Sequence, residues 1–561
     1  MDIGAILSIG SDNDLYYNGT VICEDYVQCI LPDVARIVMI LFTILYVIVH
    51  ADRLVHILCR FCLKKKPYPT LYEVIPPSST ELDYPIVAIQ LPMMNEVECG
   101  EAIIEAACNL DWPKSRLIIQ VLDDSSDKRA ISVINNCVDE WAKRGIQINV
   151  YRRPHRHGFK AGSLIYGMTF IRHVEYICIF DADFLPTKDF LSKAMPSIMH
   201  DPTCAFVQAR WTYTNSNESF LTRMQTMILN FHFKCEQEGR YRASFFFNFN
   251  GTAAIWRTSA IEEAGGWHTD TVVEDLDLSL RAHLNGWNSV YLYDVECLNE
   301  LPPTLSAYLS QQYRWVSGPM QVALKLIRRI YRTRDISLSK KLFCFWFLIR
   351  YYVNLCQVLS LIIMVPMSIW FPTTRICSLI SMYTTLFTTA TTALFTFNQF
   401  HYAIIYVMFV NGMALFNTCA SISGLLNFSS ARDWIVTPKF GFTTNNNSST
   451  KKLDEKHFST SERNETVIVL AEKKKIDQTY SYRSRIFKII ANIRIIKSIC
   501  YWFKKRFQSF RLYKRNFLMS IYLYFITWLA FNNSNPTLGI FVFCNAIMYT
   551  VLAFGYIGRF T

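Results

Sequence analysis

The first 33 residues contain no lysine or arginine, although they include six acidic residues. Apart from Arg36 within the first apolar run, the basic residues begin after that run, with Arg53 and Arg60 and the lysines at 64–66. Lysine and arginine collect on the cytosolic side of membrane segments, so this absence excludes a cytosolic N-terminal tail. We expect the tail 1–33 to be lumenal or extracellular. The apolar run also lacks a basic lead-in, so we expect a permanent anchor and no cleavable signal peptide.

The lack of a second pair of metal ligands argues against a zinc site. Cys59 and Cys62 form a CxxC pair, but no second pair of cysteines or histidines follows nearby. The formal net charge is +12, yet the basic residues gather beside apolar runs, at 64–66 and 483–515. This placement argues against nucleic acid as a partner. It is typical of contacts with anionic membrane lipid.

Long apolar runs divide the chain. They cover 34–51, 351–371, 376–397, 402–426, 517–533 and 537–557. Runs of about 20 apolar residues are candidate membrane-spanning helices. Between them, residues 80–325 are mixed in polarity and punctuated like a soluble domain. The chain is therefore predicted to be an integral membrane protein with one large soluble domain.

Strand-like and helix-like segments alternate within the soluble domain. Apolar stretches at 86–92, 117–122 and 176–180 each end in polar residues and are separated by amphipathic segments. This alternation predicts an α/β domain with an open, mainly parallel sheet and helices on both faces. Ligands bind such sheets at the carboxyl ends of the strands.

Acidic residues follow two of these predicted strands. FDADF places Asp181 and Asp183 on either side of a small residue, and VLDD places Asp123 and Asp124 at another strand end. Hard carboxylate oxygens suit Mg²⁺ or Mn²⁺ held jointly with phosphate oxygens. A lone DxD is equally explained by a solvated turn. Two unpaired acidic clusters at neighbouring strand ends are costly without a ligand, which favours a binding site.

A third acidic cluster begins a helix-like run. In VVEDLDLSLR, Glu274, Asp275 and Asp277 lie where the helix dipole favours carboxylates. Plain helix capping accounts for this pattern, and so does a general base that removes the proton of an attacking hydroxyl. Shortly before the second apolar run, QQYRW gathers Gln311, Arg314 and Trp315. A helix end at lipid headgroups would explain that stretch as well.

The motifs together resemble a known family. VLDD, HGFKAG, FDADF, FNGTAAIWR, VVEDLDLSLRA and QQYRW occur in the order found in processive family-2 glycosyltransferases, such as cellulose, chitin and hyaluronan synthases. The likeness covers about residues 84–325 and is strongest to the plant cellulose-synthase-like A and C groups. Val273 stands where most of the family has threonine, and the A group also has valine at this position. Tyr313 stands where the plant groups usually have histidine. DWIVTPKFG, 433–441, resembles the gating loop of cellulose synthases.

The resemblance implies a GT-A type nucleotide-sugar-binding domain and a role for each matching residue. Asp123 or Asp124 and Lys160 would contact the donor, and Asp181 and Asp183 would hold Mn²⁺ or Mg²⁺. Asp275 would be the base, with Glu274 supporting it. Arg314 would bind the leaving diphosphate, and Trp315 with Gln311 would bind the acceptor. Val436, Thr437 and Lys439 would belong to a gating loop within 430–442.

The resemblance also fixes the expected number of membrane passes. A gating loop must lie on the same side as the catalytic domain, so an even number of crossings separates them. We therefore expect 402–426 to be an interfacial helix and the other five runs to span the membrane. Low hydrophobicity predicts that 443–483 is a disordered cytosolic loop.

These expectations define one principal function and three alternatives. The principal function is an inverting, processive transferase that makes β-1,4-mannan or glucomannan from GDP-mannose, with GDP-glucose as co-substrate. The growing polysaccharide would then cross the membrane. The Golgi is the expected location and the plasma membrane the second choice. The first alternative is a β-1,4-glucan synthase using UDP-glucose. The second is a dolichol-linked mannosyl or glucosyl transferase, for which QxxRW and the gating-like loop would be superfluous, and the third is a catalytically dead channel or scaffold.

Overall fold

The computed structural model describes residues 21–334, 336–350, 352–395, 400–426, 512–555 and 557 of the 561-residue chain. The predicted gating loop, with Val436, Thr437 and Lys439, and the loop 443–483 lie outside these residues. Most of the predicted tail 1–33 does so too. Its last part belongs to helix α1, Val21–Cys62, which is longer at both ends than the predicted run 34–51.

An eight-stranded sheet forms the centre of the soluble domain. Its strands, in spatial order, are β3 (Gln147–Tyr151), β2 (Leu117–Asp123), β1 (Val87–Met93), β4 (Tyr176–Ile179), β7 (Ala254–Arg257), β6 (Cys204–Tyr213), β8 (Asn288–Asn299) and β5 (Phe184–Pro186). The first four strands are parallel, as the alternating pattern predicts. The second half is mixed, because β7 runs antiparallel to both β4 and β6.

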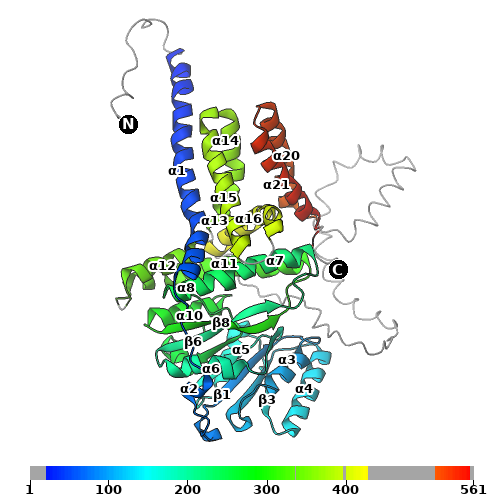
Figure 1. Ribbon diagram of the computed structural model, residues 1–561. Coiled ribbons are helices and arrows are strands. Elements are labelled where there is room, and N and C mark those ends of the chain that lie inside the picture. The colour runs from blue at the N-terminus through cyan, green and yellow to red at the C-terminus, as the bar shows by residue number, and fades with distance from the viewer. Residues whose placement is uncertain are drawn as a thin grey trace, which may run out of the picture. The chain divides into compact units, whose positions relative to one another are not determined.

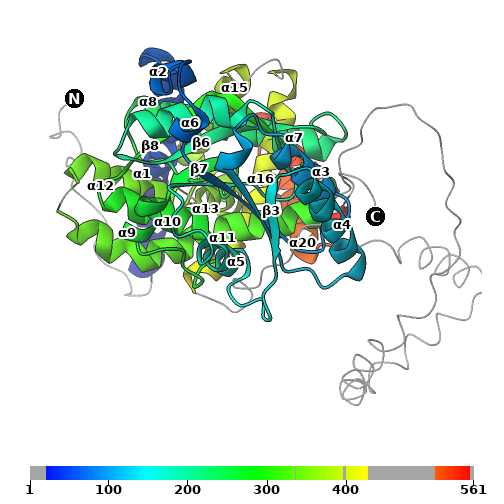
Figure 2. The ribbon, with the colours of Figure 1, turned by 90° about the horizontal axis from the view of Figure 1, so that it is seen from below.

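Helices cover both sides of the sheet, as Figure 2 shows from below. They are α2 (Leu71–Val74), α3 (Gly100–Cys108), α4 (Lys128–Lys143), α5 (Phe159–Met168), α6 (Phe190–His200), α7 (Phe220–Phe231), α8 (Glu238–Arg242), α9 (Thr258–Glu263) and α10 (Glu274–Leu284). Strands β1, β2 and β4 are buried along almost their whole length. Burial on both faces is the reason that these strands read as continuous apolar runs.

The remaining elements are mostly apolar helices. They are α11 (Leu305–Arg332), α12 (Leu338–Ile349), α13 (Tyr352–Leu359), α14 (Val365–Trp370), α15 (Arg375–Phe395), α16 (Ala403–Leu425), α20 (Lys514–Asn532) and α21 (Pro536–Phe554). A π-helical turn, η5 (Ser360–Met364), joins α13 to α14 into one continuous segment. Figure 1 shows α1, α14, α15 and the α20–α21 pair standing on one side of the sheet domain.

Four segments among the described residues are long and apolar enough to cross a membrane. They are Leu31–Cys62, Tyr352–Trp370, Ala403–Leu425 and Pro536–Phe554. Helices α15 and α20 do not meet that measure, although both were predicted to span. By length and composition alone α16 qualifies as a span, whereas the topology argument predicts an interfacial helix. In Figure 1 α16 runs across the direction of α1 and α15.

Candidate active site

The site is built where β4 ends. After β4, Asp181 and Asp183 lie in the short turn that leads to β5. The backbone N–H of Asp181 donates a hydrogen bond to Thr252 Oγ1 over 2.9 Å, which fixes the turn against the segment before β7. Both carboxylates line a cavity of about 190 Å³ at this edge of the sheet. The sequence prediction that FDADF faces a ligand site is consistent with this placement.

Lys160 on α5 links this turn to the rest of the site. The buried ammonium group forms an ion pair with Asp181 and donates a hydrogen bond to the Gly251 carbonyl over 2.9 Å. Burial lowers the pKa of Lys160, but the charges of Asp181 and Glu274 outweigh burial and leave the pKa raised. For Asp181 burial prevails over the attraction of Lys160, so its pKa is raised. The lysine is therefore a fixed positive charge on the cavity wall.

Asp275 and Glu274 enter the cavity from the first turn of α10. The backbone N–H of Leu276 donates to Asp275 Oδ1 over 2.8 Å and orients the carboxylate. Gly251 has a φ of +87°, and a methyl group there would lie 3.1 Å from Asp275 Oδ2, so glycine permits both the backbone conformation and the close approach. Burial, followed by the charge of Glu274, raises the pKa of Asp275 to about 7. Burial also raises the pKa of Glu274.

Helix α11 supplies the opposite wall. Arg314 and Trp315 follow Gln311 by three and four residues, so all three side chains lie on one face of the helix. All three line the cavity. Burial lowers the pKa of Arg314 against the attraction of Glu274, Asp181 and Asp183. The Trp315 ring lies 6.4 Å from the ring of Trp211, between centroids. The cavity lining thus combines three cationic side chains, six carboxylates and two indoles.

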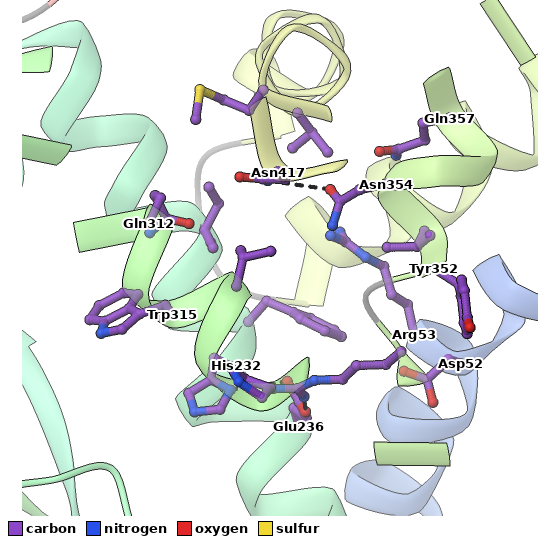
Figure 3. A pocket seen from close by; sticks show the side chains of 18 of the residues that line it. Asp52, Arg53, His232, Glu236, Gln312, Trp315, Tyr352, Asn354, Gln357 and Asn417 are labelled. Atoms are coloured by element: carbon purple, nitrogen blue, oxygen red, sulfur yellow. Dashed lines mark hydrogen bonds and ion pairs between the residues drawn. The ribbon is translucent and has the colours of Figure 1, made fainter. Parts of the chain in front are cut away.

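A second cavity of about 740 Å³ adjoins the first one. Both are lined by Trp211, Asn250, Val273, Asp275, Gln311 and Trp315. The larger cavity extends between α1, α13, α15 and α16, and Figure 3 shows polar side chains from several of these elements around it. Asn417 Nδ2 on α16 donates to Asn354 Oδ1 on α13 over 3.3 Å. The smaller, charged cavity therefore adjoins a larger cavity that has polar groups among apolar helices.

The predicted donor residues Asp123 and Asp124 differ from each other in surroundings. Asp123 is buried and accepts from Arg152 Nε over 2.7 Å, and it does not line the smaller cavity. Asp124 accepts from Arg153 Nε over 2.9 Å and does line it. The premise that these two carboxylates are unpaired is therefore wrong. Two arginines that follow β3 neutralise them.

Several lining residues had no assigned role in the sequence analysis. Arg156 lines the smaller cavity with its guanidinium 5.1 Å above the Phe159 ring. Trp211 and Asn250 line both cavities. The available signals were the basic RRPHR stretch after a predicted strand and the polar FNFNGT stretch before another one. Neither signal identifies a site until the sheet brings β3, β4 and β7 into one layer.

The residues present fit a divalent cation shared with a phosphate. Within the described part of the chain, no group of three or more His, Cys, Asp or Glu side chains is placed to hold a metal. Asp181 and Asp183 together offer two carboxylates. Mg²⁺ is commonly held by one or two carboxylates with substrate phosphates and water completing the shell. Two carboxylates on an accessible cavity wall match that donor set.

Comparisons with known proteins bear on the fold and on the class of enzyme. Residues 176–415 match the model of glycosyl transferase family group 2. Probable glucomannan 4-beta-mannosyltransferase 3 of Arabidopsis thaliana is 41% identical over 366 residues, which is 64% of this chain and 66% of that protein. Glucomannan 4-beta-mannosyltransferase 1 of Oryza sativa subsp. japonica is 40% identical over 392 residues, 68% of this chain and 75% of that protein. These alignments cover about two thirds to three quarters of the relatives.

A solved structure also aligns with the chain. It is the mannosyltransferase PcManGT from Pyrobaculum calidifontis in complex with GDP-Man and Mn²⁺, with 18% identity and a TM-score of 0.42. The alignment covers 71% of this chain and 99% of that one.

Fold and site define a glycosyltransferase with a GT-A like, nucleotide-sugar-binding α/β domain. The predicted fold class and enzyme class are thereby confirmed. The chain belongs to glycosyl transferase family 2 and, within it, to the group of the glucomannan 4-beta-mannosyltransferases.

Proposed function

We propose that this protein is an inverting, processive β-1,4-mannan or glucomannan synthase that uses GDP-mannose. The observation that carries the proposal is that Asp275 and Trp315 line both cavities. A carboxylate and an aromatic ring at the junction can serve a donor on one side and a polysaccharide end on the other. The relatives' names supply the mannosyl specificity, and GDP-glucose is the second donor for a mixed polymer.

The smaller cavity binds the nucleotide diphosphate in this proposal. Lys160 and Arg314 contribute fixed positive charge on its walls. Asp124 contacts the nucleoside part at the far end. Asp181 and Asp183 would hold Mn²⁺ or Mg²⁺, which neutralises charge on the diphosphate when bound.

Asp275 acts as the general base. The acceptor hydroxyl attacks C1 of the donor sugar from the side opposite the diphosphate, while Asp275 takes the hydroxyl proton. Its pKa of about 7 suits this task, because a base works best when its pKa lies near the working pH. Glu274 keeps that pKa high. Arg314 stabilises the negative charge that builds up on the leaving diphosphate.

The larger cavity receives the growing chain. Trp315 presents an apolar ring to the C–H face of the terminal sugar, with Gln311 beside it. Deeper in, Gln357 Oε1, Asn417 Oδ1 and the Tyr406 hydroxyl are buried without a hydrogen-bond partner among the described residues. Buried polar groups are normally satisfied, so a hydroxyl-rich ligand is a suitable occupant. This cavity would pass the polymer across the membrane.

The catalytic domain faces the cytosol in this proposal, with the enzyme in the Golgi membrane. Support comes from the basic residues that follow α1 and from the direction of α16, which suits an interfacial helix. Protease added to sealed vesicles with the cytosolic face outward should cleave within 80–325. Protection of that domain would reverse the orientation.

One experiment separates the donor possibilities. Purified membranes are incubated separately with labelled GDP-mannose, GDP-glucose, UDP-glucose and UDP-N-acetylglucosamine, and the polymer is digested with β-mannanase or β-glucanase. We expect incorporation from GDP-mannose into a mannanase-sensitive product. Incorporation from UDP-glucose into a mannanase-resistant glucan would instead establish a glucan synthase. Loss of incorporation in Asp275→Asn membranes is the control for activity from other enzymes.

A further inference from the structure

Asn250 lies at the junction of the two cavities, and hydrogen bonds hold its backbone. Its N–H donates to Gln208 Oε1 over 2.9 Å, and the carbonyl of the next residue, Gly251, accepts from Lys160 Nζ over 2.9 Å. The same Gly251 packs against Asp275. Asn250 is therefore held one residue from the contact between the catalytic carboxylate and the backbone, and it lines both cavities.

The orientation of the Asn250 amide follows from its neighbours. Asn248 Nδ2 donates to the Phe249 carbonyl over 2.9 Å, and Gln237 Nε2 donates to the Asn248 carbonyl over 3.4 Å. Carbonyl partners identify both atoms as nitrogens. Each of these nitrogens also lies 3.2 Å from the same side-chain atom of Asn250, which must therefore be its oxygen. The Nδ2 group is left buried, with no hydrogen-bond partner in the described part of the chain.

A π-helical turn supplies this support. The turn η4, His232–Gln237, continues α7 and carries His232 at its start and Gln237 at its end. Residues five apart come together in a π-turn, and Gln237 Nε2 lies 3.1 Å from His232 Nε2. His232 Nε2 also lies 3.0 Å from Asn250 Oδ1. The irregular turn thereby holds His232 and Gln237 together beside the Asn250 side chain.

We propose that Asn250 is an acceptor-binding residue whose Nδ2 donates a hydrogen bond to an oxygen of the terminal sugar of the growing chain. Gln237 is the positioning residue that keeps this group turned toward the acceptor, because its Nε2 donates to the Asn250 oxygen over 3.2 Å. The proposal rests on the proposed synthase function and deepens it. A buried N–H without a partner costs free energy until a ligand satisfies it, so binding of the sugar is favoured there.

The acceptor is a better ligand for this group than the donor diphosphate. A neutral amide donor suits a hydroxyl or ring oxygen, whereas Lys160 and Arg314 already offer charged groups to phosphate. Trp315 lines the same junction and would stack on the same sugar. Ring stacking alone leaves the sugar free to rotate in its plane. A directional hydrogen bond from Asn250 fixes that rotation and aims the hydroxyl at Asp275.

The test measures transfer and donor hydrolysis side by side. The full-length enzyme in detergent or liposomes is given GDP-mannose with β-1,4-mannotriose, and sugar transfer is compared with GDP release to water. In Asn250→Ala we expect transfer to fall on the order of tenfold relative to hydrolysis, the effect of about one hydrogen bond. Asn136→Ala, on an exposed face of α4, removes the same group elsewhere and is the matched control. An equal fall in transfer and hydrolysis would assign Asn250 to the donor and overturn the proposal.

Two further measurements test the hydrogen bond and its support. Mannotriose analogues that lack the 2-, the 3- or the 6-hydroxyl of the terminal sugar test the hydrogen bond, since the 4-hydroxyl is the attacking group. One analogue should lose in the wild type what Asn250→Ala loses with mannotriose, and it should lose nothing further in Asn250→Ala. Full additivity for all three analogues would contradict a bond to any of these hydroxyls and leave the ring oxygen. The 5-thio sugar tests the ring oxygen in the same way, and additivity there too overturns the proposal.

The positioning role of Gln237 is tested through Gln237→Met, which keeps the length of the side chain. We expect the same shift in the ratio of transfer to hydrolysis, and no further shift when it is combined with Asn250→Ala. Independent losses in the double variant would overturn the positioning role. Absence of transfer from GDP-mannose by the wild type would instead show that the proposed synthase function fails, so the two failures are distinguishable.

Discussion

Val273 lies directly against Gly318, so that a methyl group on residue 318 would stand 2.5 Å from Val273 Cγ1. Val273 immediately precedes Glu274 and Asp275, and Gly318 follows Arg314 by one helical turn on α11. This contact therefore sets the spacing between the helix that carries the proposed base and the helix that carries the proposed leaving-group cation. The valine that stands in place of the usual threonine has a structural partner.

Gly318→Ala should separate α10 from α11. Adding a methyl group to a packed contact typically costs about 1–3 kcal/mol, so we expect a lower thermal midpoint and a larger loss of transferase activity. Val273→Ala makes room for the new methyl group. The double variant should therefore recover stability relative to Gly318→Ala, as followed by thermal unfolding in detergent. A double variant less stable than either single variant would contradict this account.

Asp275→Asn should nearly abolish transfer. The amide keeps the shape but cannot accept the proton, and a positioned base contributes roughly 10²–10⁴-fold to a rate. Donor binding should persist, because the groups around the diphosphate are unchanged. Titration of GDP-mannose binding beside a polymer assay checks both statements.

Asp277→Asn is the comparison for that variant. Asp277 is fully buried and paired with Arg281 over 2.7 Å and with Lys325 over 3.0 Å, which gives it a structural role. We therefore expect Asp277→Asn to lower the thermal midpoint, whereas Asp275→Asn should not. Normal polymer synthesis by Asp275→Asn would require another base.

Transfer should depend on pH with a midpoint near 7. A carboxyl group with a raised pKa is protonated below that value, so the base is absent at low pH and present above about pH 7. The value of kcat/KM for transfer should rise through this range. Asp275→Asn should remove the rising limb from its residual activity. A wild-type limb near pH 4 would contradict the raised pKa.

Trp315→Ala should fail in a different way from Asp275→Asn. Loss of a central aromatic contact costs about 2 kcal/mol or more, so the chain end would bind loosely and transfer would suffer more than donor hydrolysis. Asp275→Asn should lower both signals. Trp315→Phe keeps a ring and should restore much of the transfer. Equal losses of transfer and hydrolysis in Trp315→Ala would show that the ring serves the donor.

Divalent metal should be required for polymer synthesis. Asp181 and Asp183 present hard oxygens toward the predicted diphosphate position, so we expect EDTA to abolish activity and Mn²⁺ or Mg²⁺ to restore it. Asp183→Asn should raise the metal concentration needed for half-maximal rate. Asp189→Asn changes an aspartate of the same segment that pairs with Lys193 away from the cavity, and should leave that concentration unchanged. Full activity in excess EDTA would refute metal dependence.

Much of the site could be predicted because its signals are local. The acidic residues at strand ends, the acidic start of α10 and the face formed by Gln311, Arg314 and Trp315 depend on spacing within a few residues. The partners of those residues could not be predicted in the same way. Arg152 and Arg153 lie 29 residues from the aspartates that they neutralise, and Lys325 lies 48 residues beyond Asp277. Such pairs form only after distant elements pack together.

The sequence by itself determined the α/β class, the apolar helices and most of the charged residues that meet in the cavity, because periodicity and residue type act over short distances. Only the tertiary structure decided which carboxylates face the cavity. It also decided that Asn250 points its amide into the junction and that Val273 requires a glycine across from it. These features depend on contacts between η4, α10, α11 and the segment before β7, which no local pattern encodes.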